Sequence, residues 1–432
     1  MSTQPSTTQS TRGPMIIIGI LFFIFGFVTW LNGPLITFVK LAFHLDTYSK
    51  AFMVTTAFYM AYFFLALPSS WILERTGMKK GMALGLLLMA IGTFVFGTYA
   101  TQRNYNISLA GLFVIGSGLS LLQTASNPYI SILGPIESAA KRISIMGICN
   151  KSAGILSPIV ISALVFSGVG DLERMVADAT SESAREILLN EFAAKIYVPY
   201  MVMAGILVLL AIWVAKSALP DIDASSANAE AVGDSTLSKE KTSIFQFPHL
   251  LLGALCIFVY VGVEVIAGDA IGAYAQGFNI PAAKTTIYTS FTLGAMLVGY
   301  IIGLFTIPKI ISQGQALKIS AILGIIFTLG AYLTTGYVSV AFVALLGLAN
   351  ALMWPAIWPL AISGLGKFTE KGSALMIMGL AGGAIIPQLF ATFKDKFDFQ
   401  LVFLVLTGVC YLYILYYSGP GHKTGKPRQA EI

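Results

Sequence analysis

Charged residues are scarce in this 432-residue chain. Asp, Glu, Lys and Arg make up 11% of its residues, whereas a soluble domain carries about 25%, and hydrophobic residues make up 56%. With a mean hydropathy of +0.80, the chain has too little polar surface for a soluble enzyme, a nucleic-acid-binding domain or a disordered protein. The composition therefore predicts an integral membrane protein.

Cysteine and histidine are also rare, with three residues of each. The cysteines all lie in apolar stretches, without the spacing of a disulfide framework or a metal site. His44, His249 and His422 lie near the ends of apolar stretches, which argues against a histidine proton relay. The sequence contains no nucleotide-binding loop, zinc cluster or catalytic triad. We therefore expect neither an enzyme nor a cofactor or resident metal.

Long apolar runs are what the chain does contain. A helix needs about 20 apolar residues to cross a bilayer, and twelve runs meet this length, so we predict an all-α membrane protein with twelve transmembrane helices. The predicted spans are 16–40, 50–72, 81–100, 107–133, 143–168, 196–216, 247–275, 285–307, 317–335, 338–363, 372–392 and 399–417.

The basic residues predict the orientation. If both termini are cytoplasmic, 16 of the 26 Lys and Arg residues lie on the cytoplasmic side and nine on the other, in keeping with the positive-inside rule. The net charge of +6 is thus spread over loops and does not indicate a nucleic-acid partner. We expect a multi-pass protein of a bacterial inner membrane, with the lipid bilayer as its surroundings.

Loop composition divides the chain into two halves. Residues 169–195 are charged and predict a short amphipathic excursion, whereas residues 217–245 are small and polar and predict a flexible cytoplasmic linker. The predicted segments are a disordered tail 1–15, a six-helix bundle 16–216, the linker 217–245, a six-helix bundle 246–417 and a tail 418–432.

The two halves also repeat one another. A basic residue, a Gly and a Pro are spaced by 12 and then 4 residues in both halves, at Arg142, Gly154 and Pro158 and at Lys371, Gly383 and Pro387. Because six spans separate the copies, the repeat is parallel and predicts two bundles related by a pseudo-twofold axis. Secondary transporters built this way bind substrate between their halves, near the bilayer midplane.

The loop between the second and third spans resembles the cytoplasmic signature of the major facilitator superfamily. It reads SWILERTGMKK, in which Glu74 and Arg75 precede Gly77 and two lysines. The resemblance implies a gating role for these three residues, and we assign Arg142 to the gate as well. An ordinary positive-inside loop is the alternative, because Ser70 stands where the signature has Gly and Glu74 replaces its Asp.

A more specific resemblance covers residues 20 to 417. FFIFGFVTWLNG, LLQTASNPY, GICNKSAG, YVGVEVIAGD and ANALMWPAIWPLAISGLGKFTEKGSA are similar to the fucose–galactose–glucose–N-acetylglucosamine branch of that superfamily. The resemblance implies a cation-coupled sugar importer with Asn150 at its sugar site. Fucose-permease members carry acids where this chain has Gly33 and Gln123, so their proton relay is absent here, which favours a coupling ion other than a proton at that site.

Apart from charges at the ends of the spans, three charges fall inside predicted spans: Lys151 in the fifth, and Glu264 and Asp269 in the seventh. A charge in the bilayer is costly and marks a functional site by default. We predict that these residues couple transport to Na⁺ or H⁺, with Na⁺ bound near Glu264 or Asp269. The two acids are about 140° apart on a regular helix and cannot face the same lumen unless the glycines around them break it. Purely structural roles remain the alternative, and for Lys151 the alternatives include a salt link to either acid.

Amide and indole side chains are concentrated on spans that line a facilitator cavity. Amides donate and accept hydrogen bonds, as sugar hydroxyls require, and indoles stack on the apolar face of a sugar. We predict substrate-binding roles for Trp30, Asn32, Gln123, Asn127, Asn150, Asn350, Trp354 and Trp358, and note Gln388 as a further polar group. Contacts between helices are the alternative for each of these residues.

The sequence therefore predicts a monomeric symporter for a small sugar and a cation. N-acetylglucosamine or glucose is the favoured substrate, among hexoses and N-acetylhexosamines. A transport-inactive sugar sensor is one alternative, but it usually carries a cytoplasmic signalling domain. A facilitator-type exporter of small amphiphiles is another, but it would favour a more apolar cavity.

Overall fold

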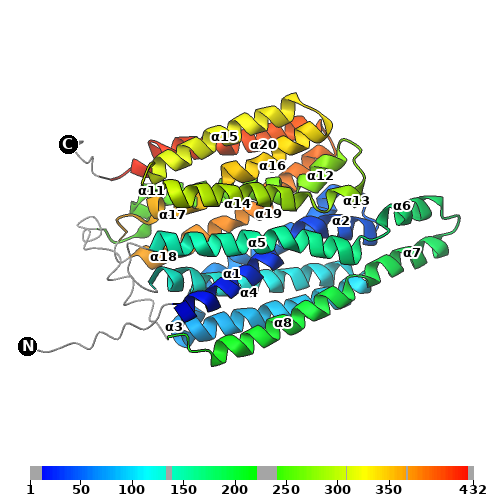
Figure 1. Cartoon of the computed structure of the whole chain (residues 1–432), viewed down its shortest axis with the longest axis horizontal. Helices are drawn as coiled ribbons and strands as arrows, with labels where there is room; N and C mark the ends of the chain where they lie inside the picture. Colours follow the sequence, from blue (N-terminus) through cyan, green and yellow to red (C-terminus); the bar gives the residue numbers. More distant parts are fainter. Residues whose placement is uncertain (1–11, 133–138, 221–240, 308, 366–367, 427–432) are drawn as a thin grey trace, which may run out of the picture.

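The computed structural model describes residues 12–132, 139–220, 241–307, 309–365 and 368–426. These residues form helices joined by turns, with no strand in the described ranges. Most of the long helices run roughly parallel or antiparallel along one direction (Figure 1). Helix α1 begins and α20 ends at the same end of the molecule, which we call the terminal end, and the opposite end is the far end.

The first half of the chain forms helices α1 to α8. Their bounds are α1 Arg12–Thr29, α2 Asn32–Ala42, α3 Tyr48–Thr101, α4 Tyr105–Ile132, α5 Ala139–Val165, α6 Val169–Asp178, α7 Glu182–Ala194 and α8 Tyr197–Lys216.

The second half forms helices α11 to α20. Their bounds are α11 Pro248–Gly268, α12 Ile271–Gln276, α13 Ala282–Thr285, α14 Tyr288–Thr306, α15 Gln313–Leu333, α16 Gly336–Asn350, α17 Met353–Ile362, α18 Thr369–Met378, α19 Gly382–Lys394 and α20 Phe399–Ser418, with short 3₁₀ turns η2 Ile244–Gln246, η4 Gly379–Ala381 and η5 Gly421–Lys423.

Eleven segments in the described ranges are long and apolar enough to cross a membrane, and one of them contains two spans. Helix α3 has 54 residues and bends at Gly77, whose φ of 76° lies in the left-handed region that favours glycine. Phe58, before the bend, and Gly85, after it, both abut the same part of α4, near Gly116 and Gly118. The two parts of α3 therefore lie side by side, and the twelve predicted spans are all present.

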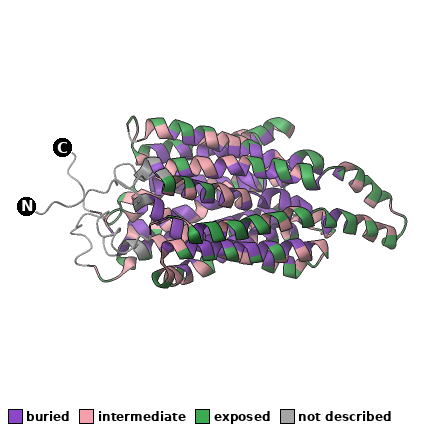
Figure 2. Ribbon diagram, turned by 60° about the horizontal axis from the view of Figure 1, so that its bottom comes forward, coloured by how far each residue is buried: buried purple, intermediate pink, exposed green. Residues whose placement is uncertain are grey.

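The twelve spans form two six-helix bundles, α1 to α8 and α11 to α20, as predicted. Buried residues lie at the centre of the molecule and exposed residues on its outer surfaces (Figure 2). The outer surface carries large apolar side chains such as Phe94, Leu209, Phe305 and Val409, each more than half exposed. An apolar exterior is stable only against lipid, which agrees with the predicted membrane location.

Four of the predicted spans are interrupted away from their ends. The first span breaks between α1 and α2, at Trp30 and Leu31, and the seventh breaks between α11 and α12, at Asp269 and Ala270. The tenth and eleventh spans break at residues 351–352 and 379–381. Because the first and seventh spans are equivalent in the repeat, both bundles bring a broken helix to the same depth.

The structure of the connecting segments agrees in part with the prediction from the sequence. Residues 169–195 form the helices α6 and α7, which project from the far end (Figure 2). Helix α1 already begins at Arg12, so residues 12–15 of the predicted tail are helical. Residues 1–11, 427–432 and most of the predicted linker, 221–240, lie outside the described residues. The segment boundaries themselves stay predictions.

A close contact between two helices of the second bundle predicts a mutational effect on stability. A Cβ atom at Gly382 would lie 1.7 Å from the carbonyl oxygen of Phe258 in α11, so Gly382→Ala should lower the free energy of unfolding by about 1–3 kcal/mol. Gly205→Ala in α8 is the control, because nothing lies within 4 Å of its added methyl group. Thermal unfolding of the purified protein in detergent checks this, and equal midpoints for both variants would contradict it.

Candidate functional site

A cavity of about 130 Å³ lies at the interface between the two bundles. Helices α1, α3, α4 and α5 of the first bundle and α11, α14 and α17 of the second contribute side chains to its wall. Seven of the predicted site residues line it: Trp30, Gln123, Asn127, Asn150, Lys151, Glu264 and Trp354. The fold therefore gathers residues from both halves of the chain around one space.

An ion pair joins the two bundles at this cavity. Lys151 Nζ of α5 lies 3.0 Å from Glu264 Oε1 of α11, and the two side chains are only 9% and 12% exposed. The ammonium group also lies 4.4 Å from the centre of the Trp30 ring, a cation–π contact. Of the two partners left open for Lys151 by the sequence, Glu264 is therefore the one it meets here. Each charge offsets the desolvation of the other, and both border the space that a ligand would fill.

The amides at the cavity are held by neighbouring groups. Gln123 Nε2 donates a hydrogen bond to the Tyr62 hydroxyl at 2.9 Å, and Asn150 Nδ2 approaches the Phe22 carbonyl oxygen at 3.4 Å. Each contact fixes the direction of an amide and leaves other donor or acceptor positions for a ligand. The wall can therefore offer hydrogen bonds in both directions from fixed positions.

Sequence reasoning missed the tyrosines of the cavity. Tyr59, Tyr62, Tyr260 and Tyr300 all line it, and together with Trp30 and Trp354 they give it a largely aromatic wall. Tyr59 and Tyr62 stack with ring centres 6.1 Å apart, which their spacing of three residues on one helical face permits. In a chain with 18 tyrosines, composition alone gave no reason to select these four.

Three predicted substrate-binding residues lie away from the cavity wall. Asn350 is fully buried and accepts a hydrogen bond from the Tyr411 hydroxyl at 2.8 Å, and Asn32 is 1% exposed. Trp358 stacks on Trp354 with ring centres 5.2 Å apart and does not itself line the cavity. Hydropathy and residue type did not distinguish these positions from the lining ones.

The two acids of the seventh span have different surroundings. Glu264 lines the cavity, whereas Asp269 is 2% exposed, does not line it, and has no hydrogen-bond partner on either carboxylate oxygen within the described structure. Asp269 lies at the break between α11 and α12, next to Gly33 of α2. One carboxylate thus borders the cavity while the other is enclosed between the bundles.

The predicted gating residues lie at the terminal end of the first bundle. Glu74 and Arg75 are exposed and form no ion pair with each other in the described structure, although Gly77 makes the expected turn. Arg142 is 7% exposed and its Nε donates to the Ile130 carbonyl at 2.9 Å, which links the start of α5 to the end of α4.

The far end of the bundle interface is closed by polar contacts. Gln388 of α19 donates to the Ser49 carbonyl at 2.9 Å, and Ser162 of α5 pairs with Thr286 at 2.8 Å. Tyr48 bonds Gln276, and its ring lies 3.6 Å from Lys394 Nζ. Gln388 therefore joins the two bundles at the far end rather than lining the cavity.

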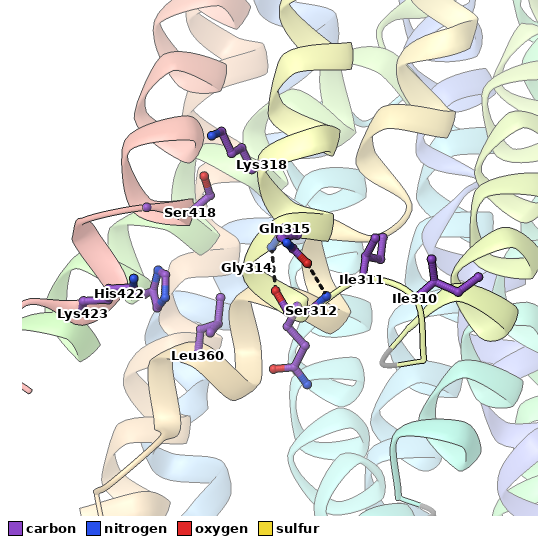
Figure 3. Close-up of a pocket in the computed structure, with 12 residues that line it drawn as sticks. Ile310, Ile311, Ser312, Gly314, Gln315, Lys318, Leu360, Ser418, His422 and Lys423 are labelled. Atoms are coloured by element: carbon purple, nitrogen blue, oxygen red, sulfur yellow. Dashed lines mark hydrogen bonds between the residues drawn. The ribbon is translucent and has the colours of Figure 1, made fainter. Parts of the chain in front are cut away.

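A larger hollow, about 630 Å³, lies at the terminal end within the second bundle (Figure 3). Lys318, Leu360 and Lys423 line it, beside the capping box in which Ser312 and Gln315 bond each other's backbone at the start of α15. None of the predicted site residues contributes to its wall. The central cavity, rather than this hollow, is the candidate functional site.

The buried ion pair predicts strong coupling between its two residues. Lys151→Met or Glu264→Gln leaves the other charge buried without a partner, which should lower the free energy of unfolding by about 3–5 kcal/mol. The double variant should lose less unfolding free energy than the two single losses added together. Denaturation of all three proteins in detergent measures this coupling.

Lys50 and Asp46 provide the control, because this ion pair is largely solvent-exposed, and the same cycle there should show no measurable coupling. Additive losses at Lys151 and Glu264 would contradict the interaction across the bundle interface.

Comparison with known proteins places the fold in a family. The model of the Major Facilitator Superfamily matches residues 18–387. A glucose/galactose transporter of Brucella abortus is 32% identical over 427 residues, which cover 98% of each chain. An L-fucose-proton symporter of Escherichia coli is 26% identical over 385 residues, which cover 88% of this chain and 87% of the other.

Solved structures agree on the architecture. The crystal structure of FucP, a transporter of this superfamily in the outward conformation, superposes with a TM-score of 0.73 at 24% identity, covering 96% of this chain and 99% of that one. At this identity the likeness concerns the fold. The relatives are named as transporters and not as enzymes. Together with its two six-helix bundles, these matches show that the chain belongs to the Major Facilitator Superfamily of multi-pass membrane transporters.

Proposed function

We propose that this chain is a secondary transporter that imports a small sugar together with a cation by alternating access. The observation that carries the proposal is the central cavity, where fixed amides, an aromatic wall and a buried ion pair from the two bundles meet. Amides match the hydroxyls of a sugar, and aromatic rings match its apolar face.

Hexoses are the first candidate substrates. The glucose/galactose transporter at 32% identity supports glucose or galactose, and N-acetylglucosamine is a further candidate from the resemblance of the sequence motifs. Glu264 balances the positive charge of Lys151 in this conformation. The Lys151 charge therefore does not indicate an anionic substrate. Trp30, Gln123, Asn127, Asn150 and Trp354 are the proposed sugar contacts.

Alternating access requires that the cavity opens to each side in turn. With the terminal end cytoplasmic, as the basic residues favour, the far end faces the periplasm across a bacterial inner membrane. The polar contacts of Tyr48 and Gln388 then close the outer entrance in this conformation. At the terminal end, Glu74, Arg75 and Arg142 are proposed to control the opposite entrance.

Uptake into proteoliposomes tests the function directly. Purified protein should accumulate D-glucose or D-galactose against its gradient when an inward pH or Na⁺ gradient is applied, and a panel that includes N-acetylglucosamine will rank the substrates. Empty liposomes are the control. Uptake of none of these sugars under either gradient would contradict the proposal.

A substitution in the cavity tests the proposed sugar contacts. Asn150→Ala removes an amide from the wall, so binding of the best sugar should weaken by roughly fivefold to tenfold, the equivalent of about one hydrogen bond. Isothermal titration calorimetry measures this.

Asn190→Ala is the matched control, because this amide lies on the exposed surface of α7 and should leave binding unchanged. Equal affinity of the Asn150→Ala protein and the unaltered protein would remove Asn150 from the site.

A further inference from the structure

Asp269 occupies an unusual position at a break in a transmembrane helix. It is the C-cap residue that follows α11, where its N–H bonds the Val265 carbonyl at 2.7 Å, and α12 begins two residues later. Its side chain is 98% removed from solvent. Interrupted helices in secondary transporters commonly bind the coupling ion at such breaks.

No hydrogen bond of good geometry reaches the carboxyl group of Asp269 in the described structure, although the backbone of Gly33 lies close enough to interact with it. Both of its oxygens are buried without a hydrogen bond. On the neighbouring helix α2, the Asn32 Nδ2 atom is also buried and without a partner. Because an ionised carboxylate in such surroundings is very unfavourable, the group that fits this site is a neutral, protonated carboxyl.

Helix α2 of the first bundle packs directly against the Asp269 carboxyl group. A Cβ atom at Gly33 of α2 would lie 3.4 Å from Asp269 Oδ1 and 2.4 Å from the Thr289 hydroxyl. The absence of a side chain at Gly33 therefore leaves the space in which the carboxyl group sits. Because α2 belongs to the first bundle and Asp269 to the second, separating the bundles at the far end would expose the carboxyl group.

Trp30 separates Asp269 from the central cavity. One edge of its ring lies against Gly268, where an added Cβ would be 2.5 Å from the indole, and Lys151 Nζ lies over the ring. Glu264 and Lys151 are the charged groups within electrostatic reach of Asp269, and the Tyr59 phenol lies within reach of both acids. The site is thus distinct from the cavity but close enough to respond to its contents.

Hydroxyl and carbonyl oxygens surround the helix break. Thr292 donates to the Ala267 carbonyl at 2.7 Å and Thr289 to the Gly268 carbonyl at 2.8 Å. Each of these carbonyl oxygens keeps a second lone pair, so the oxygens alone do not select between a proton and Na⁺. The observation that favours a proton is the burial of both carboxylate oxygens without a hydrogen bond, because a neutral carboxyl needs no counter-charge.

We infer that Asp269 is the proton-binding group of this transporter, at a site separate from the sugar cavity. This inference rests on the proposed sugar transport. The carboxylate takes up a proton from solution when the bundles part at the far end. The neutral carboxyl is then enclosed against Gly33, as in this conformation. It releases the proton once the terminal end opens, and Glu264, which pairs with Lys151 in this conformation, is not the group that carries it.

Asp269→Asn tests the inference, because an amide keeps the shape of a neutral carboxyl but cannot release a proton. In proteoliposomes containing a pH-sensitive dye, adding D-glucose or D-galactose should drive proton entry with the unaltered protein. This signal should fall at least tenfold in Asp269→Asn, and accumulation against a gradient should be lost. Sugar counterflow, which needs no net proton movement, should stay within about threefold.

Asp46→Asn is the matched control, since this carboxylate is exposed at the far end and should leave both signals unchanged. Proton entry that persists in Asp269→Asn would overturn the inference, as would sugar-driven Na⁺ entry without proton entry in the unaltered protein. Either result leaves sugar transport standing. Absence of all sugar transport would instead remove the proposed function and this inference together.

A carboxyl swap tests the position of the site. Gly33→Asp combined with Asp269→Gly moves the carboxyl group to the other wall of the same space, with rotation of the Thr289 hydroxyl to admit it. Sugar-driven proton entry should recover at least threefold relative to Asp269→Gly alone. A swap variant that catalyses counterflow but shows no recovery would contradict a shared site at these two positions.

Discussion

The ion pair between Lys151 and Glu264 is the interaction on which the rest of this structure depends. Two charges can remain near the centre of a bilayer protein only if each has a partner, and here the partners belong to different bundles. The pair therefore holds the two bundles together at the level of the cavity and orients Trp30, which lies under the ammonium group. Any motion that separates the bundles must replace this contact with another, such as a ligand or water.

The arrangement of breaks follows from the repeat. The first and seventh spans are equivalent, and both change from one helix to another, at Trp30 and Asp269. These breaks place an indole on the cavity and a carboxyl group behind it. Asp269 keeps a helical conformation at the end of α11, so it is turned by about 140° from Glu264 and the two acids have different surroundings. The proposed division between a sugar site and a proton site thus follows from their spacing of five residues on this helix.

Much of this architecture was predictable, because bilayer thickness fixes how long an apolar run must be. The twelve spans and the parallel repeat follow from sequence patterns, and so does a cluster of polar residues around Lys151, Asn150 and Glu264. The complete set of cavity-lining residues did not follow. Asn32 and Asn350 lie behind the wall, and Tyr59 and Tyr260 lie on it, because helix rotation and helix breaks depend on contacts between helices that are distant in sequence.

The contact between Gly33 and Asp269 has a consequence for how relatives of this protein are compared. Fucose permeases carry an acid at the position that matches residue 33 of this chain. A comparison one position at a time therefore reads Gly33 as the loss of a proton-binding residue. In space, a carboxyl group stands beside that glycine, supplied by the opposite half of the molecule. Loss of a carboxyl group at one position can therefore be offset by a carboxyl group at the facing position. Pairs of facing positions should be compared together when the coupling ion of a transporter is inferred from its sequence.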